Sequence, residues 1–385
     1  MNKNLILSVI VSVLFSNGIV EVNSFYSSSL EEQRNYTIYL PNGYYESNNQ
    51  YPVIYFLHGF GGDNNSYNSF HSSLNSMMSD SSIMEMIVVN VDGSTDLYSG
   101  SFYTNSVLNG DYEDYVVYDL VNHIDSTYRT LAMREFRGLS GHSMGGYGAF
   151  RLGLYHSDIF SSFAAHSGPI HLENLNNPFL INVILIEAFF GPLEPNNGST
   201  TLMMFGLSAA FSPNLDNPPW YVDLPIDNSG TVNWDVFEMW QQHDPYLLVD
   251  NHLETLATQN IYFDCGSSDE LQLYPHSEDM HDKLFDLGIA HTYAPYSGTH
   301  SGSIYQKLED SFQFHSDYFS SIEFGLPGDV NDDGLLNVLD IVVLISFILN
   351  NASPNDSEFN ASDINSDGII NVLDIVLLVS SILEG

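Results

Sequence analysis

The chain has 385 residues, 44% of them hydrophobic, so it can bury at least one full core and suits one large domain with a small appendage. It carries 8 Lys and Arg against 48 Asp and Glu, a formal net charge of −40. This excess of carboxylates argues against binding nucleic acid or anionic membranes through basic patches, and it favours a saline or calcium-containing habitat. The single cysteine, Cys265, excludes an intramolecular disulfide; the β-like run before it predicts a buried, inert thiol.

The N-terminus has the layout of a signal peptide. Lys3 precedes an apolar run over 5–15, and small and polar residues follow as far as Asn23. The run is too short to cross a bilayer as a helix. We therefore expect a leader over 1–23 and a secreted or cell-surface protein. A buried N-terminal strand or a lipid-facing anchor is the alternative, because Lys3 is the only positive charge before the run and no clean cleavage site follows it.

From residue 34 onward, apolar runs alternate with helical patterns. This alternation predicts an α/β fold, a mainly parallel sheet with helices on both faces. The expected strands are 36–40, 53–57, 86–91, 136–139, 160–166, 261–263 and 290–294, and the expected helices are 112–128, 143–155, 276–287 and 303–319. The large domain is thus expected over 24–322, and a turn-rich segment from Glu323 to Pro327 leads into a small domain over 323–385.

A proline-rich segment over about 169–242 interrupts the alternation. Its apolar stretches at 179–190 and 202–211 predict an insertion that acts as a lid over the site. The three tryptophans of the chain, Trp220, Trp234 and Trp240, all fall inside it. Each is a candidate for substrate contact, and each could equally belong to the core of the lid.

A nucleophile motif follows the expected strand at 136–139. Gly141-His142-Ser143-Met144-Gly145 is a G-x-S-x-G pentapeptide between a strand and a helix. In the α/β-hydrolase fold the serine occupies a sharp turn there, where larger flanking side chains would clash. Ser143 is therefore the expected nucleophile.

A nucleophilic serine needs a base and an acid, which in this fold follow in the order Ser, Asp or Glu, His. Asp269 and His300 lie in loops after two later strands, on the side where Ser143 emerges, and we take them as acid and base. The alternatives are Asp264 or Glu270 for the acid and His276, His281 or His291 for the base.

An oxyanion also needs hydrogen-bond donors. His58-Gly59-Phe60-Gly61-Gly62 follows the strand at 53–57, so this loop should lie beside the serine turn. The backbone amides of Phe60 and Met144 are the expected oxyanion hole.

These motifs resemble the esterase family that includes feruloyl esterases, acetyl-xylan esterases, S-formylglutathione hydrolases and mycolyltransferase-like proteins. The likeness extends over about 34–320, and its further matching stretches are Val91-Asp92-Gly93, Ser101-Phe102-Tyr103, Tyr112-Glu113-Asp114-Tyr115 with Asp119-Leu120, and His243-Asp244-Pro245-Tyr246. The chain has Phe102 where the family commonly has Trp, and its insertion is longer. The resemblance implies a serine esterase without a catalytic cofactor, with Tyr103 as a further substrate-binding candidate.

A duplicated acidic loop lies near the C-terminus, over 329–340 and 363–374. Oxygen ligands at loop positions one, three, five, seven, nine and twelve, with glycine at six, suit Ca²⁺. The expected ligands of two structural ions are Asp329, Asn331, Asp333, Leu335, Asn337 and Asp340, and Asp363, Asn365, Asp367, Ile369, Asn371 and Asp374. The alternative is a pair of solvated acidic loops without metal.

The repeats resemble type I dockerins, in which the side chains at loop positions ten and eleven help to select a cohesin partner. Here these positions hold Val338 and Leu339, repeated as Val372 and Leu373, and they are more apolar than the usual hydroxyl-rich pairs. The resemblance predicts a small all-α calcium-binding domain and a cohesin-type partner.

Together these patterns predict a secreted serine esterase that removes acyl groups from polysaccharide, of the feruloyl or acetyl-xylan type. The alternatives are a lipase-like or polyester-active enzyme, which the apolar insertion favours, an acyltransferase on the same fold, and a catalytically silent binding module. Intact nucleophile, acid, base and oxyanion segments argue against the silent module.

Overall fold

The computed structural model describes residues 17–322, 328–331, 333–365 and 368–384. The chain forms two compact units, one extending to Phe319 and the other beginning at Ser320. The apolar run over 5–15 lies outside the described residues.

The first unit contains an eight-stranded sheet in the order β1-β2-β4-β3-β7-β8-β9-β10. The pairings of β1 with β2 and of β2 with β4 are antiparallel, and all those from β4 to β10 are parallel. The bounds are β1 (Ile19–Ser27), β2 (Glu32–Leu40), β3 (Val53–Leu57), β4 (Ile87–Val91), β7 (Arg137–His142), β8 (Ser162–His166), β9 (Asn260–Asp264) and β10 (Thr292–Tyr293). A two-stranded ribbon pairs β5 (Asn105–Ser106) with β6 (Gly110–Asp111).

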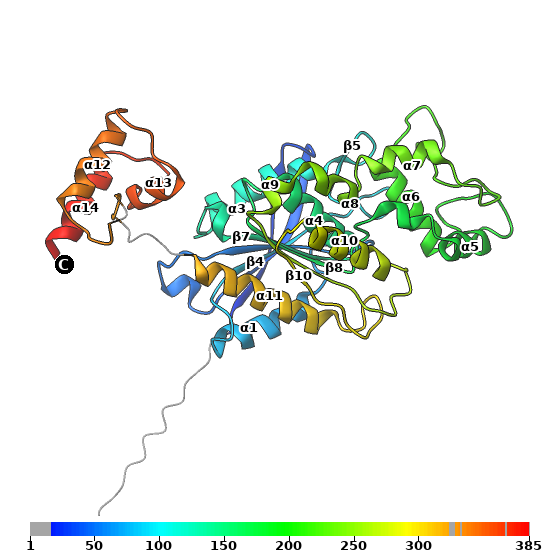
Figure 1. Ribbon diagram of the computed structural model, residues 1–385, viewed down its shortest axis with the longest axis horizontal. Helices are drawn as coiled ribbons and strands as arrows, with labels where there is room; N and C mark the ends of the chain where they lie inside the picture. The colour runs from blue at the N-terminus through cyan, green and yellow to red at the C-terminus, as the bar shows by residue number, and fades with distance from the viewer. Residues whose placement is uncertain (1–16, 323–327, 332, 366–367, 385) are drawn as a thin grey trace, which may run out of the picture. The chain divides into compact units, whose positions relative to one another are not determined.

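Helices cover both faces of the sheet (Figure 1). Every residue of β3, β4 and β8 is buried, as expected of parallel strands covered on both sides. The helices α1 (His71–Ser79) and α11 (Ile304–Ser321) lie on one face, and α3 (Val121–Thr127), α4 (Met144–Tyr155) and α10 (Tyr274–Asp286) lie on the other. The predicted helix over 112–128 is one continuous run in which α2 (Tyr112–Asp114), a π-helical segment (Tyr115–Leu120) and α3 follow one another.

The insertion between β8 and β9 has its own helices and core. They are α5 (Pro178–Glu187), α6 (Ser199–Phe211) and α7 (Trp234–Gln241), followed by α8 (Pro245–Leu248) and α9 (Leu253–Leu256). α5 begins where the side chain of Asn177 accepts a hydrogen bond from the amide of Phe179, with Pro178 in the first turn. A hydrophobic cluster that includes Ile184, Phe205 and Ile226 joins the segments of the insertion.

The N-terminal boundary predicted from the sequence falls within the first strand of the sheet. β1 pairs with β2 in unbroken register from Ile19 to Ser27. A leader that ended at Asn23 would remove more than half of this strand from the sheet. The predicted boundary after Asn23 thus falls inside β1. The buried strand that was the alternative concerns the apolar run over 5–15, which lies outside the described residues.

The second unit packs α12 (Val338–Ile348), α13 (Asp356–Ser362) and α14 (Val372–Glu384) around a small core. Val330, Leu344, Phe347 and Leu378 are its buried apolar residues. α12 begins with a capping box. The side chain of Asn337 accepts a hydrogen bond from the backbone amide of Asp340, and the Asp340 carboxylate accepts one from the backbone amide of Asn337. The unit is all-α, as predicted for the small domain.

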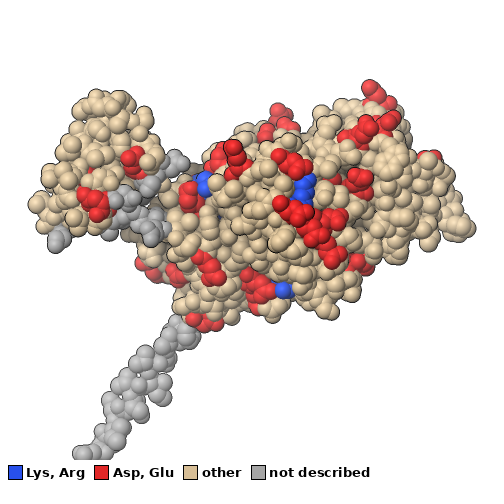
Figure 2. All heavy atoms as spheres, in the orientation of Figure 1, with Lys and Arg blue, Asp and Glu red and all other residues tan. Residues whose placement is uncertain are grey.

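Acidic side chains are scattered over the visible surface, and basic ones are sparse (Figure 2). Among the described residues, no helix has the length and apolar character needed to cross a membrane.

Candidate functional site

Ser143 lies at a strained turn between β7 and α4. Its backbone angles are φ 59° and ψ −116°, which non-glycine residues seldom adopt. The turn is tightly enclosed, because a Cβ on Gly145 would lie 1.9 Å from the carbonyl oxygen of Leu57, and one on Gly141 would lie 2.2 Å from that of Gly145. The two motif glycines therefore let β7, α4 and the end of β3 approach one another, and this packing fixes the half-buried serine.

His300 and Asp269 form a charge-assisted hydrogen bond. His300 Nδ1 lies 2.7 Å from Asp269 Oδ2, and both residues are buried, at 8% and 4% exposure. Burial raises the pKa of Asp269, but the hydrogen bond and charge of His300, with the amide of Leu271, outweigh it and hold that pKa below its ordinary value. The Asp269 carboxylate is thus ionised at neutral pH and orients the imidazole.

The competing acids and bases have other partners. Asp264 accepts from His166 Nδ1 at 2.9 Å, and both side chains are fully buried. Glu270 accepts a hydrogen bond from the backbone amide of His300 at 3.0 Å. This bond holds the loop and does not involve the imidazole ring.

The alternative bases also lie in other surroundings. The ring of His281 hydrogen-bonds that of His291 at 2.8 Å. His276 is buried, which lowers its pKa to about 3. Of the candidate bases, His300 is therefore the one that the structure pairs with Asp269.

His142, the residue before the serine, connects the turn to the histidine loop. Its Nε2 donates to the carbonyl oxygen of His300 at 2.9 Å, and the two rings are 4.8 Å apart at their centroids. A carbonyl oxygen can only accept, so Nε2 carries the proton of the neutral ring. Nδ1 therefore accepts a hydrogen bond from the hydroxyl of Tyr67, at 2.7 Å. Burial, followed by the charge of His300, lowers the pKa of His142 to about 3, so this ring is neutral. The bond joins the loop of His300 to the residue that precedes Ser143.

The Gly59 to Gly62 loop lies against the serine turn. A Cβ on Gly59 would lie 3.4 Å from that of Ser143. His58 braces the loop, since its Nδ1 donates to the Gly59 carbonyl at 2.7 Å and its Nε2 accepts from the Gly93 amide at 2.9 Å. Burial lowers the pKa of His58, consistent with a neutral ring.

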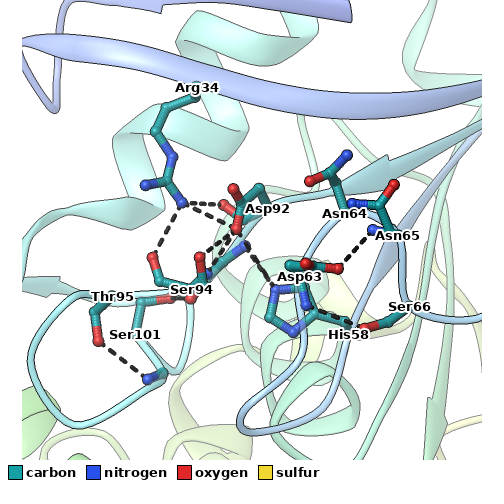
Figure 3. A network of polar contacts seen from close by, with 12 residues as sticks. Arg34, His58, Asp63, Asn64, Asn65, Ser66, Asp92, Ser94, Thr95 and Ser101 are labelled. Carbon is teal, nitrogen blue, oxygen red and sulfur yellow. Dashed lines mark hydrogen bonds and ion pairs between the residues drawn. The ribbon is translucent and has the colours of Figure 1, made fainter. Parts of the chain in front are cut away.

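Arg34 and Asp92 extend this brace to β2 and β4 (Figure 3). The Arg34 guanidinium lies 3.1 Å from Asp92 Oδ1 and donates to the carbonyls of Asp92 and Ser94. Asp92 Oδ1 in turn accepts from the hydroxyl of Ser94 at 2.6 Å. This network fixes the Val91-Asp92-Gly93 turn on which His58 rests.

The two predicted oxyanion-hole residues lie on these elements. Met144 is the first residue of α4, where the helix dipole favours negative charge, and Phe60 follows Gly59. Phe60, Ser143 and Met144 all line one hollow. The predicted oxyanion-hole residues thus border the same space as the serine.

The other predicted contact residues lie away from this hollow. Tyr103 is fully buried and its hydroxyl donates to the His58 carbonyl at 3.0 Å, so it supports the loop, and the expectation that it contacts substrate is replaced by this role. Trp240 is buried and donates to Ser212 Oγ at 2.9 Å, Trp220 packs against Phe205, and Trp234 is 54% exposed. None of the three tryptophans lines the hollow at Ser143.

The sequence did not point to several residues that complete the site. Tyr67, Leu175, Leu180, Met203, Leu207, Leu271 and Leu273 contact either the serine turn or its hollow. Leu271 and Leu273 follow the acid by two and four residues, a proximity that could have suggested them. Arg34 could have been noticed because Lys and Arg number only 8 in the chain.

The two acidic loops fold alike. Asp329 accepts from the amide of Gly334 and Asp363 from that of Gly368, both at 2.7 Å, and the two glycines have φ 78° and 79°. Asp340 and Asp374, both buried, each bond back into their own loop.

The predicted calcium ligands combine carboxylates with amide and backbone oxygens. Among the described residues, no three His, Cys, Asp or Glu side chains meet closely enough to hold a metal ion by themselves. Asp367, one of the predicted ligands, lies outside the described residues.

Comparisons with known proteins agree with this geometry. Esterase Rv1288 of Mycobacterium tuberculosis is 28% identical over 153 residues, 39% of this chain and 32% of that protein. A protein of Xylanibacter ruminicola named endo-1,4-beta-xylanase/feruloyl esterase is 26% identical over 180 residues, 44% of this chain and 24% of that protein. The chain thus matches about a third or less of the length of these relatives. A solved ferulic acid esterase shares the fold, with a TM-score of 0.58 and 19% identity over 79% of this chain and 99% of that one.

Two family models match separate parts of the chain. Residues 327–383 match the Dockerin type I domain, which coincides with the helical unit and its paired acidic loops. Residues 27–308 match the model described as Putative esterase, a range that includes the strands from β2 to β10, the serine turn, the insertion and the His300 loop. The chain has the α/β-hydrolase fold and belongs to this esterase family.

Proposed function

We propose that the chain is a serine carboxylic-ester hydrolase in which Ser143, His300 and Asp269 form the catalytic triad. The observation that carries the proposal is the short His300 to Asp269 hydrogen bond, in a loop that bonds to His142, the neighbour of the strained serine in G-x-S-x-G. No cofactor is needed, because these groups supply a nucleophile, a base and an orienting charge.

The reaction follows from these roles. Ser143 Oγ attacks the acyl carbon while its proton passes to His300 Nε2, and the ionised Asp269 stabilises the resulting imidazolium. The amides of Phe60 and Met144 donate to the oxyanion of the tetrahedral intermediate. His300 then protonates the departing alcohol, leaving an acyl-enzyme. Water activated by His300 attacks the acyl carbon next, and collapse of the second intermediate releases the acid and restores Ser143.

The alcohol half of the substrate is, in this proposal, a plant or algal polysaccharide or its fragments. The dockerin match supports it, since an exported hydrolase with such a module works on insoluble polymers. The name of the Xylanibacter ruminicola relative, which couples a xylanase to a feruloyl esterase, points the same way. The chain is accordingly proposed to be secreted, with a leader that ends before Ile19.

The dockerin-like unit is proposed to bind two Ca²⁺ ions. The first loop offers Asp329, Asn331, Asp333, Asn337 and Asp340 side chains and the Leu335 carbonyl, and the second loop offers the corresponding residues of 363–374. Hard oxygen donors around a glycine turn suit this cation, whose charge would offset repulsion among the carboxylates.

A cohesin-type protein is the proposed partner of this unit. Val338 and Leu339 are 64% and 54% exposed, and Val372 and Leu373 are 63% and 49% exposed. Each repeat thus presents the same apolar pair at the start of its helix, and either pair could be buried against a partner.

Replacing the nucleophile tests the first proposal. Ser143→Ala should lower kcat for nitrophenyl acetate by several powers of ten, because the acyl-enzyme cannot form. It should also abolish mass-spectrometric labelling by a fluorophosphonate. Ser140→Ala is the matched control, since Ser140 is buried three residues earlier in β7 and lies outside the Ser143 hollow. Retention of more than about a hundredth of wild-type kcat by Ser143→Ala would refute the triad.

The acid is tested by a pair of substitutions. Asp269→Asn should reduce kcat on the order of 10⁴-fold, because it removes the charge that stabilises the His300 imidazolium. Asp264→Asn should act mainly on the melting temperature, because Asp264 pairs with His166 in the core. Initial rates and thermal melts of both variants separate the two roles, and the reverse order of activity loss would assign the acid to Asp264.

Calcium removal should affect one unit alone. A chelator should lower the melting temperature of the helical unit, because uncompensated carboxylates repel one another there. Turnover of nitrophenyl acetate should stay nearly unchanged, since the proposed triad and oxyanion residues lie outside both acidic loops. Calorimetry and initial rates, each repeated after calcium is restored, check both parts. Loss of activity on chelation would reveal a metal requirement in the esterase unit.

Partner binding should survive the loss of one apolar pair. Changing Val338 and Leu339 to Asp should leave capture of a cohesin-type receptor largely intact through the second repeat. Changing Val372 and Leu373 as well should abolish it, because burial of an unpaired charge is unfavourable. A pull-down from the source organism's surface extract with calcium present measures this, and recovery of no partner by the wild-type chain would exclude a tethering role there.

A further inference from the structure

The hollow beside Ser143 is lined by apolar side chains. Apart from the serine, its walls are Phe60, Phe102, Met144, Pro169, Leu175, Leu180, Met203, Leu207, Leu271 and Leu273. Such a surface favours an apolar group and supplies no side-chain partner for a polar one. An acyl group bound to Ser143 would therefore project among aliphatic side chains.

A second hollow lies within the insertion. It shares four wall residues with the first: Leu175, Leu180, Met203 and Leu207. Its far walls include Ile184 of α5, Met204 of α6, Ile226, and Phe237 and Trp240 of α7. The two hollows thus adjoin across a shared set of side chains, and the flexible, unbranched Met203 is among them.

The lining also bears on hydroxylated aromatic acyl groups. The indole nitrogen of Trp240 already donates to Ser212, so it is engaged within the protein. Asn176 and Thr200 are the other polar side chains of the second hollow, and the first has none besides Ser143. A phenolic hydroxyl buried in the first hollow would lose its water without a side-chain partner, which is unfavourable. An alkyl chain has no such penalty.

We propose that the two hollows form one acyl-binding groove for an unbranched aliphatic chain of medium length, with the carbonyl at Ser143 and the chain end between α5, α6 and α7. This inference rests on the proposed serine esterase function and specifies the acyl half of its substrate. Ile184 is then a specificity-determining residue, because it lines only the second hollow and is 7% exposed.

The test is a panel of nitrophenyl acetate, butyrate and octanoate together with methyl ferulate, assayed with the full chain. In the wild type, kcat/KM should rise by roughly fourfold for each methylene that enters the groove, the equivalent of the transfer free energy of one CH₂ group. Octanoate should therefore exceed acetate, and methyl ferulate should be the poorer substrate.

Two matched substitutions on α5 locate the chain end. Ile184→Phe narrows the second hollow and should lower kcat/KM for octanoate by about four- to sixteenfold, the loss of one to two buried methylenes, with acetate changed less than about twofold. Ile186→Phe is the control, because Ile186 lies on the same helix and is 72% exposed. Ile184→Ala should shift the preference toward longer chains. Thermal melts and the acetate rate monitor folding of each variant.

The outcomes separate this inference from the function on which it rests. Wild-type preference for acetate or methyl ferulate over octanoate, or an equal loss on acetate and octanoate in a folded Ile184→Phe variant, would overturn the aliphatic groove while leaving the esterase in place. Hydrolysis of no ester by the wild type, or wild-type rates in Ser143→Ala, would overturn both.

Discussion

The close approach at the serine turn is the constraint on which the site depends. Gly145 lies so near the Leu57 and His58 carbonyls that any side chain there would collide with them. β3, β7 and α4 must therefore meet at one point, and the strain at Ser143 is maintained by the buried sheet around it. The loop that begins at His58 leaves the same point, so the proposed nucleophile and oxyanion donors are positioned by one piece of packing.

Much of this arrangement could be predicted from the sequence, because it follows from local patterns. Strands such as 53–57 are short, wholly apolar runs, and a parallel sheet buries them on both faces. The His300 to Asp269 pair follows from chain order and from the rule that loops after parallel strands share one edge of the sheet. β1 was assigned in part to the leader because its outward residues are exposed, and a half-exposed edge strand shows only weak apolar character.

The remaining features depend on contacts between distant segments. Tyr67 reaches His142 across 75 residues of sequence, and Arg34 reaches the Asp92 turn across 58. The walls of the two hollows come from several helices of the insertion, whose packing no period in the sequence specifies. Trp234 illustrates the limit, since its type suggested substrate contact whereas its position on α7 leaves it largely exposed.

The neutral ring of His142 has a consequence for the electrostatics of the proposed reaction. A second cation 4.8 Å from His300 would repel the imidazolium that forms there and make proton uptake harder. Burial, followed by the charge of His300, lowers the pKa of His142 and keeps it uncharged, so it supplies a hydrogen bond to the His300 backbone without opposing the charge on the neighbouring ring. A lysine at this position could also donate to the His300 carbonyl, but it would bring a positive charge close to the imidazolium. The neutral imidazole of His142 donates the same hydrogen bond without that repulsion.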